Sequence, residues 1–164
     1  MVIRPCDVLD AEALTDLHLD VWEEAYAGLI PSNIFAARRS ERRVRVERWR
    51  QIIASGSSRN LLIEDDHVVG RLLGFSSTGV GRDGPETDLP AHELMALYVR
   101  ADVYGRGVGY ELLQAALGRA GAYLWVLDGN TRAITFYERQ GFVFDGTTKS
   151  ADVGLERRMV RRTS

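Results

Sequence analysis

The sequence is poor in several features on which specialised proteins depend. A single cysteine, Cys6, excludes an internal disulfide and leaves no cysteine cluster for a metal ion. No apolar run approaches the ~18 residues of a membrane-spanning helix, and residues 1–5 lead into a charged segment without a signal-peptide pattern. The formal net charge of −2 lacks the basic excess that nucleic-acid binding requires. We therefore expect a cytoplasmic protein without metal, nucleic-acid or membrane partners.

What the chain does contain is typical of a globular domain. Hydrophobic residues make up 45% and charged residues 27% of its 164 residues, an ordinary balance, and the length suits one domain over residues 1–164 with one sizeable core. Periodicity and turn residues predict, in order, a strand at 2–4, a helix from Asp10 to near Gly28, a further turn at 32–37, a long helix capped by Ser40, a hairpin of 61–64 and 68–77, a loop at 78–90, a strand at 94–99, a helix at 107–119, a strand at 122–127, a short helix at 131–140, and a closing strand pair at 142–144 and 155–160.

Three glycines at alternate positions, Gly105, Gly107 and Gly109, lie between the expected strand 94–99 and the expected helix 107–119. Because glycine has no Cβ atom, it lets a ligand approach the backbone closely and accepts positive φ angles. The first amides of the following helix have no partner within it, and the helix dipole adds partial positive charge there. This order of elements predicts a phosphate-binding site. Glycines that serve packing alone are the alternative.

Two other phosphate-binding motifs fit this turn less well. A P-loop is excluded because no Gly-Lys-Ser/Thr follows the turn. A dinucleotide fingerprint would use Gly105, Gly107 and an acidic residue, Asp128, after the next strand, but Tyr110 stands where its third glycine belongs. Only 54 residues follow Tyr110 (164 − 110), too few for the strands that such a fold still needs. A dinucleotide-binding βαβ protein is therefore the remote alternative.

Two motifs and the order of elements along nearly the whole chain resemble the GNAT superfamily of acyl-CoA-dependent N-acetyltransferases. The family's pyrophosphate-loop pattern is Gln/Arg-x-x-Gly-x-Gly/Ala, and here Gly107 and Gly109 fill its glycine positions. Tyr104 stands at the first position, which removes one side-chain contact but leaves the backbone amides available. The second motif, similar to the family's stretch after the fifth strand, is Asn130-x-Arg132-Ala133-x-x-Phe136-Tyr137-x-x-x-Gly141-Phe142.

The resemblance implies a single-domain α/β (mixed α+β) fold: a central twisted mixed sheet of about seven strands, helices on both faces, and splayed central strands that form an acyl-CoA cleft. Acetyl-CoA would be the co-substrate, with its pyrophosphate on the amides of residues 104–110 and its pantetheine arm along strand 94–99. An amide of residues 97–99 would donate to the thioester oxygen. The residues placed against acetyl-CoA are Leu97, Tyr98, Val99, Tyr104, Gly105, Arg106, Gly107, Val108, Gly109, Tyr110, Asn130, Ala133, Phe136 and Tyr137.

The resemblance assigns catalysis to Tyr137 and Glu93. A phenol with a pKa of ~10 keeps its proton at neutral pH and can give it to the departing thiolate, so Tyr137 is the expected general acid; a core tyrosine is the alternative. Glu93 would take the proton of the amine, directly or through water. The alternative is that Glu93 is only a solvated residue at the end of the strand. His92 is an alternative base, although neighbouring strand residues face opposite sides. Asn130 would bond the co-substrate or cap a helix.

In this family the first two helices wall the acceptor site. His18, Trp22 and Tyr26 are spaced four apart and share one helix face, so with Glu23 they would line that site and suit a cationic amine. A wide apolar face with surface charges is the alternative. The arginines that follow are expected to form a solvated helix face; they are Arg38, Arg39, Arg42, Arg43, Arg45, Arg48 and Arg50.

We therefore expect a transferase that moves an acetyl group from acetyl-CoA to a primary amine of a small molecule or a peptide, by direct attack in a ternary complex. A protein N-terminal or lysine acetyltransferase is one alternative, and a non-catalytic acyl-CoA-binding module on the same fold is another. The sequence leaves open which amine is used, whether the acyl group is acetyl or longer, and whether the chain forms a homodimer.

Overall fold

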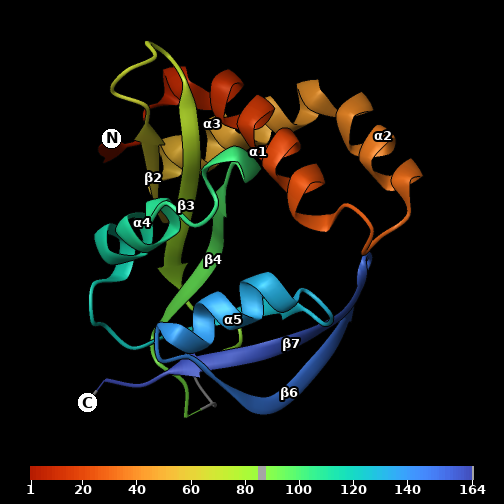
Figure 1. Cartoon of the computed structure of the whole chain (residues 1–164), viewed down its shortest axis with the longest axis vertical. Helices are drawn as coiled ribbons and strands as arrows, with labels where there is room; N and C mark the ends of the chain where they lie inside the picture. The colour runs from red at the N-terminus through yellow and green to blue at the C-terminus, as the bar shows by residue number, and fades with distance from the viewer. Residues whose placement is uncertain (85–87, 164) are drawn as a thin grey trace.

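The computed structural model describes residues 1–84 and 88–163 and is built on one seven-stranded sheet with the strand order β1-β2-β3-β4-β5-β7-β6 (Figure 1). This confirms the expected mixed sheet of about seven strands. The strands are β1 Val2–Pro5, β2 Ser58–Glu64, β3 Leu72–Val80, β4 His92–Val99, β5 Ala122–Leu127, β6 Val143–Ala151 and β7 Gly154–Arg161. The helices are α1 Ala11–Tyr26, α2 Ser32–Ser40, α3 Arg42–Ser55, α4 Val108–Leu117 and α5 Thr131–Arg139, with short 3-10 turns at Val8–Asp10 and Ala101–Val103.

The parallel strands β4 and β5 are paired at one position and then separate. Glu93 of β4 lies opposite Tyr123 of β5, whereas β3 and β4 stay paired along their length. Figure 1 shows β4 running steeply through the molecule while β7, the other neighbour of β5, crosses below it. Among the described residues, the C-terminal part of β4 therefore has no strand on its β5 side, and its main-chain groups there lack ladder partners.

A bulge in β4 decides which side chains face which helices. Met95 is the extra residue, since Leu94 and Ala96 occupy consecutive pairing positions opposite β3. The alternation of sides shifts at this point. Leu94 and Leu97 pack with the core under α4 and α5, while Ala96 and Tyr98 pack against the core under α1 and α3.

Helices cover both faces of the sheet. Alternating residues of β2 divide between the two cores, as the period of two in a strand requires, whereas in β3 the alternation is interrupted at Leu73, where the pairing with β2 is irregular. None of the helices in residues 1–84 and 88–163 is both long and apolar enough to cross a membrane. The core under α1 and α3 contains Leu14, Leu17, Val21, Val46, Trp49, Leu62 and Phe75. The core under α4 contains Leu61, Ile63, Leu73, Val103, Val108 and Leu112.

Four of the seven arginines of α2 and α3 are exposed, as expected for a solvated helix face, but the sequence did not predict their ion pairs. Several of them bind carboxylates of α1: Arg39 Nη2 lies 3.0 Å from Asp20 Oδ1, and Arg42 Nε lies 2.6 Å from Asp16 Oδ1. A further pair joins α3 to the first turn of α1. Exposed pairs of this kind contribute about 0–1 kcal/mol each, but together they fix the position of α1 against α2 and α3.

Some element boundaries also differ from expectation. Ser40 ends α2 and donates its hydroxyl to the carbonyl of Ala37, so it does not cap α3, which follows Glu41. The expected single turn at 32–37 is the longer helix α2. Strand β6 was expected to end at residue 144 but extends to Ala151. In this longer part Lys149 pairs with Glu156 across the hairpin with β7. The first residues of the expected loop 78–90 belong to β3, and residues 85–87 of that loop lie outside the described residues.

Candidate active site

A cleft of about 670 Å³ opens where β4 and β5 separate. Its walls are the C-terminal part of β4, the glycine turn with the start of α4, and α5. Every residue predicted to contact acetyl-CoA except Arg106 lies on these walls: Leu97, Tyr98, Val99, Tyr104, Gly105, Gly107, Val108, Gly109, Tyr110, Asn130, Ala133, Phe136 and Tyr137.

Other residues of the cleft walls were missed by the sequence reasoning. A helical period was available for α5, because Arg132, Thr135 and Arg139 lie at spacings of three and four beside Phe136. The bulge residue Met95 gave no local signal, since a bulge depends on the pairing of two strands. The missed residues are Ala25, Leu94, Met95, Ala96, Val103, Trp125, Val126, Thr131, Arg132, Thr135, Arg139 and Gln140.

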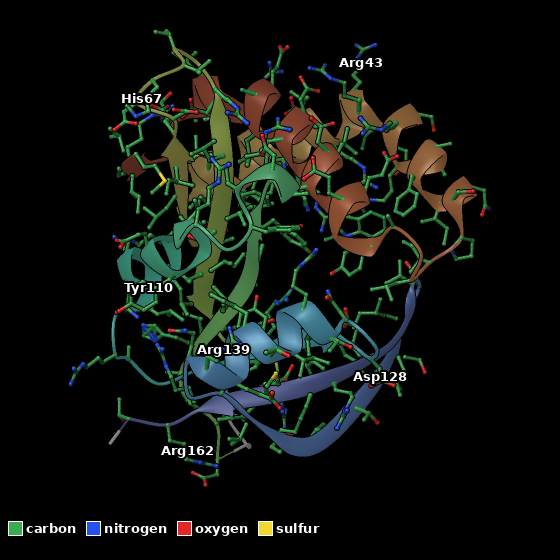
Figure 2. The ribbon with its side chains drawn as sticks, viewed as in Figure 1. Arg43, His67, Tyr110, Asp128, Arg139 and Arg162 are labelled. Carbon is green, nitrogen blue, oxygen red and sulfur yellow. The ribbon has the colours of Figure 1, made fainter. Side chains whose placement is uncertain are left out.

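The charge on the cleft walls is positive. Among the described residues that line the cleft there are two guanidinium groups, Arg132 and Arg139, and no Asp, Glu or His. The Arg132 guanidinium lies over the ring of Tyr104, 3.9 Å from its centroid, so it stands beside the position where the family pattern has Gln or Arg. Figure 2 shows Tyr110 on α4 and Arg139 on α5. A wall of this kind suits a polyanionic ligand.

The glycine turn leaves a row of amides free at the start of α4. Gly105 and Gly107 have φ angles of 74° and 82°, and a Cβ atom at either would meet nothing within 4 Å. Gly107 precedes the first residue of α4, and its carbonyl accepts from Glu111. Within the described chain, none of the four amides from Gly107 to Tyr110 donates to another main-chain group. Four adjacent free amides at a helix N-terminus form an anion-binding concavity.

Tyr137 presents a free hydroxyl to the cleft from an otherwise buried ring. The residue is 8% exposed, and its ring packs edge-on against Phe136 and Phe142, with centroid distances of 5.3 and 5.8 Å. Its hydroxyl makes no hydrogen bond within the described residues. Burial, and to a smaller extent the nearby Tyr26, raises the pKa of Tyr137 above its ordinary value. The phenol therefore stays protonated across the physiological range.

Asn130 caps α5. Its Oδ1 accepts a hydrogen bond from the amide of Ala133 at 3.3 Å, which is the ordinary capping role. The residue also lines the cleft and is 6% exposed. Both expectations, a cap and a cleft residue, are therefore compatible with its position, and its side-chain NH2 makes no hydrogen bond within the described chain.

Of the four residues predicted to line an acceptor site, Tyr26 alone is among those that line the cleft. Its hydroxyl lies 2.9 Å from the hydroxyl of Tyr98, and burial raises the pKa of both phenols. Trp22 is 7% exposed and packs under Phe35. Glu23 points elsewhere and binds Arg39, with 2.9 Å between Oε2 and Nη2.

His18 is packed among aromatic rings. Its ring centroid lies 4.9 Å from that of Phe75, 5.7 Å from that of Tyr98 and 5.8 Å from that of Trp49. Burial, with the positive charges of two arginines, lowers the pKa of His18 to about 3. The imidazole is therefore neutral at physiological pH and is a much weaker base than an ordinary histidine.

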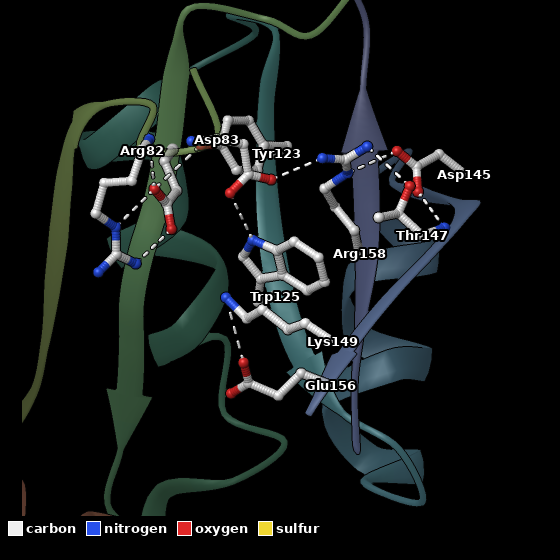
Figure 3. Close-up of polar contacts among 10 residues, drawn as sticks. Arg82, Asp83, Tyr123, Trp125, Asp145, Thr147, Lys149, Glu156 and Arg158 are labelled. Carbon is white, nitrogen blue, oxygen red and sulfur yellow. Dashed lines mark hydrogen bonds and ion pairs between the residues drawn. The ribbon is translucent and has the colours of Figure 1, made fainter. Parts of the chain in front are cut away.

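Glu93 is engaged in a buried network and is absent from the cleft walls. Its side chain is 1% exposed, and Arg82 binds it through Nε at 2.9 Å and through its main-chain amide at 3.1 Å (Figure 3). The Tyr123 hydroxyl donates to the same carboxylate at 3.2 Å. Burial favours the neutral acid, but the Arg82 contacts outweigh it and lower the pKa of Glu93. A carboxylate with this pKa and these partners is poorly suited to take a proton from an amine. His92 is exposed and lies outside the cleft walls.

The substitution Arg82→Gln tests this network. It leaves the Glu93 carboxylate buried without its cation, so we expect the free energy of unfolding at neutral pH to fall by about 1–3 kcal/mol. Adding Glu93→Gln to Arg82→Gln should cost less than the sum of the single changes. The folded pKa of Glu93 is lowered, so the stabilisation is complete above the unfolded pKa of ~4.3 and is lost as pH falls through the folded pKa.

Urea unfolding at neutral and acidic pH measures both effects. The matched control is Arg43→Gln, because Arg43 is exposed and makes no ion pair within the described residues. Equal stability of the wild type and Arg82→Gln at neutral pH would contradict the role given to this ion pair.

Comparisons with known proteins agree with this geometry. The model of the Acetyltransferase (GNAT) family matches residues 14–142. A probable N-acetyltransferase of Mycobacterium tuberculosis is 26% identical over 150 residues, 89% of this chain and 82% of the relative. A peptidyl-lysine N-acetyltransferase of Salmonella typhimurium is 36% identical over 67 residues, 40% of this chain and 46% of the relative. The crystal structure of a Thermoplasma acidophilum PaiA N-acetyltransferase with coenzyme A has a TM-score of 0.72 at 18% identity, covering 98% of both chains. The chain belongs to the acetyltransferase (GNAT) family and is an acyl-CoA-dependent N-acetyltransferase.

Proposed function

We propose that this enzyme transfers the acetyl group of acetyl-CoA to a primary amine of a small molecule by direct attack in a ternary complex. The observation that carries the proposal is the cleft between β4 and β5, with free amides at one end and a free phenol on its wall. One pocket thus offers a site for a diphosphate, an open strand edge and an acid. These are the groups that acyl transfer from a thioester carrier needs.

The co-substrate would be held by main-chain groups more than by side chains. Its diphosphate lies on the amides of residues 107–110, and Arg132 and Arg139 add positive charge to the same cleft. The pantetheine arm pairs with the unpartnered edge of β4 as an extra strand would. Glycine at 105 and 107 keeps the approach to these amides clear.

The chemistry then requires one bond to form and one to break. The amine nitrogen attacks the thioester carbonyl carbon, and the oxygen that becomes negative is stabilised by an amide of residues 97–99, next to the β4 bulge. When the C–S bond breaks, the thiolate takes the proton of the Tyr137 hydroxyl. The proton that the amine releases then passes through water to Tyr137 and restores its hydroxyl.

The deprotonation of the amine is left to water in this scheme. The described residues that line the cleft contain no Asp, Glu or His, and Glu93 is held by Arg82. The rate should therefore follow the pKa of the acceptor itself, which favours α-amines at ~8 over lysine side chains at ~10.4. A peptide lysine is the second candidate acceptor, because the Salmonella relative is named as a peptidyl-lysine N-acetyltransferase. The described residues of the cleft walls, however, offer no carboxylate to a cation.

The direct test is release of the CoA thiol from acetyl-CoA, measured over a panel of amino acids, polyamines, aminoglycosides and short peptides. Thiol release that depends on an amine supports the transferase. Tight binding of acetyl-CoA without release in any member of the panel, at neutral and alkaline pH, would instead identify a non-catalytic acyl-CoA-binding module.

The substitution Tyr137→Phe removes the proposed acid and keeps the ring that packs on Phe136 and Phe142. We expect kcat to fall by roughly 10²–10⁴-fold, with the affinity for acetyl-CoA unchanged. Since burial raises the pKa of Tyr137, the wild-type rate should not decline through loss of this proton up to pH ~10. Steady-state rates across pH measure both points, and an unchanged kcat in the variant would remove Tyr137 from the mechanism.

The substitution Gly109→Val tests the amide site without straining the fold. Gly109 has no positive φ, and its Cβ would make ordinary contacts, 3.7 Å from Phe136 and 4.0 Å from Leu97. A branched side chain there should obstruct the diphosphate and raise the Kd of acetyl-CoA about tenfold or more. Calorimetric titration gives the Kd, and the melting temperature without ligand shows whether folding is intact. Wild-type affinity in a folded variant would refute the amide site.

A further inference from the structure

Arg38 of α2 is a partly buried cation that has no anionic partner among the described residues. Its guanidinium carbon lies 3.8 Å from the centroid of the Trp22 ring, and its Nε is buried with no hydrogen-bond partner. The residue makes no ion pair or hydrogen bond through its side chain with any described residue. Burial, and then the charge of Arg45, lowers the pKa of Arg38. An unsatisfied donor of this kind is costly to leave in a folded protein.

The neighbouring arginines explain why no described carboxylate pairs with Arg38. Arg39 takes both Asp20 and Glu23 on the outer side of α1. Arg45 binds Glu41 at 2.8 Å and also donates to the main-chain carbonyl of α2 at residue 38. The acidic side chains near this segment are therefore already paired, and Arg38 is the inward-facing exception.

Arg38 is not itself among the described residues that line the cleft, but it is separated from them by one side chain, that of Trp22. The Trp22 ring under its guanidinium also contacts Tyr26, with centroids 5.0 Å apart. The charge of Arg38 acts on the hydroxyls of Tyr26 and Tyr98, and both of these residues line the cleft. Ala25 and Tyr26 bring the end of α1 to the cleft, and the amine of the proposed reaction would approach the thioester from this side.

We propose that Arg38 binds a carboxylate of the acceptor, so that the substrate is an amine that also carries a carboxylate, of the amino-acid class. A planar guanidinium that stacks on an indole by one face still has N–H donors in its plane for the two oxygens of a carboxylate. A phosphate dianion would call for a second free cation, and the two nearest arginines, Arg39 and Arg45, are already paired. This inference rests on the proposed function, since it names the acceptor of the same cleft.

The test compares matched amines with and without the carboxylate. L-Phenylalanine, L-leucine, β-alanine and γ-aminobutyrate are each paired with their carboxamides and titrated into the CoA-loaded protein, and KM and kcat are measured with acetyl-CoA. We expect the wild type to prefer the acid of at least one pair by about tenfold or more, because a hydrogen-bonded charge pair is lost in the amide. Arg38→Met should abolish the preference through KM, with kcat and the Kd of acetyl-CoA unchanged.

The control is Arg43→Met, which removes an exposed arginine (Figure 2) and should keep the preference. If Arg38→Met lowers the melting temperature, Arg38→Gln repeats the test with a shorter polar side chain. Equal binding of acid and amide by the wild type, no binding of any acid, or an equal loss for both in the variants would each overturn the assignment of Arg38.

The outcomes also separate the two proposals. Thiol release with equal KM for acids and amides would overturn the role of Arg38 and leave acetyl transfer standing. Arg38-dependent binding of the acids without any thiol release would support the carboxylate site and count against transfer.

Discussion

The strands β4 and β5 meet where Glu93 lies opposite Tyr123, and side chains reinforce the main-chain pair at this point. The Glu93 carboxylate accepts hydrogen bonds from the Tyr123 hydroxyl of β5 and from Arg82 of the preceding loop. It therefore ties two strands and a loop together at the closed end of the splay. Beyond it the strands diverge, the main-chain groups of β4 lose their neighbours, and a cleft opens that an extended amide-bearing arm can fill.

The same constraint organises the charges. Some carboxylates lie at the closed end of the cleft, where they bind Arg82 and Arg158. Others lie on the outer face of α1, where they bind arginines of α2 and α3. The described cleft walls are left with free amides, phenols and two guanidinium groups. Such walls favour anionic groups on both substrates: the diphosphate of the thioester carrier at α4, and a carboxylate of the acceptor near Arg38.

How well the sequence predicted each part depended on how local the interactions are. The glycine turn and the face of α5 are encoded within short segments, so Gly107, Asn130 and Tyr137 could be placed on the cleft walls from motif spacing. The environment of Glu93 could not, because Arg82 and Tyr123 reach it through strand pairing and a loop closure that no local pattern records. The ion pairs of the exposed arginine run could not be predicted either, since the partner carboxylates lie on another helix.

The account depends on the open edge of β4 and the free amides of the glycine turn as the binding surface for acetyl-CoA. Residue-resolved amide hydrogen exchange, with and without acetyl-CoA, measures both surfaces at once. We predict slower exchange in residues 94–99 at the amides that face away from β3, and in residues 107–110, with little change in β2 and β6. Unchanged exchange at both places in a protein saturated with acetyl-CoA would contradict the account.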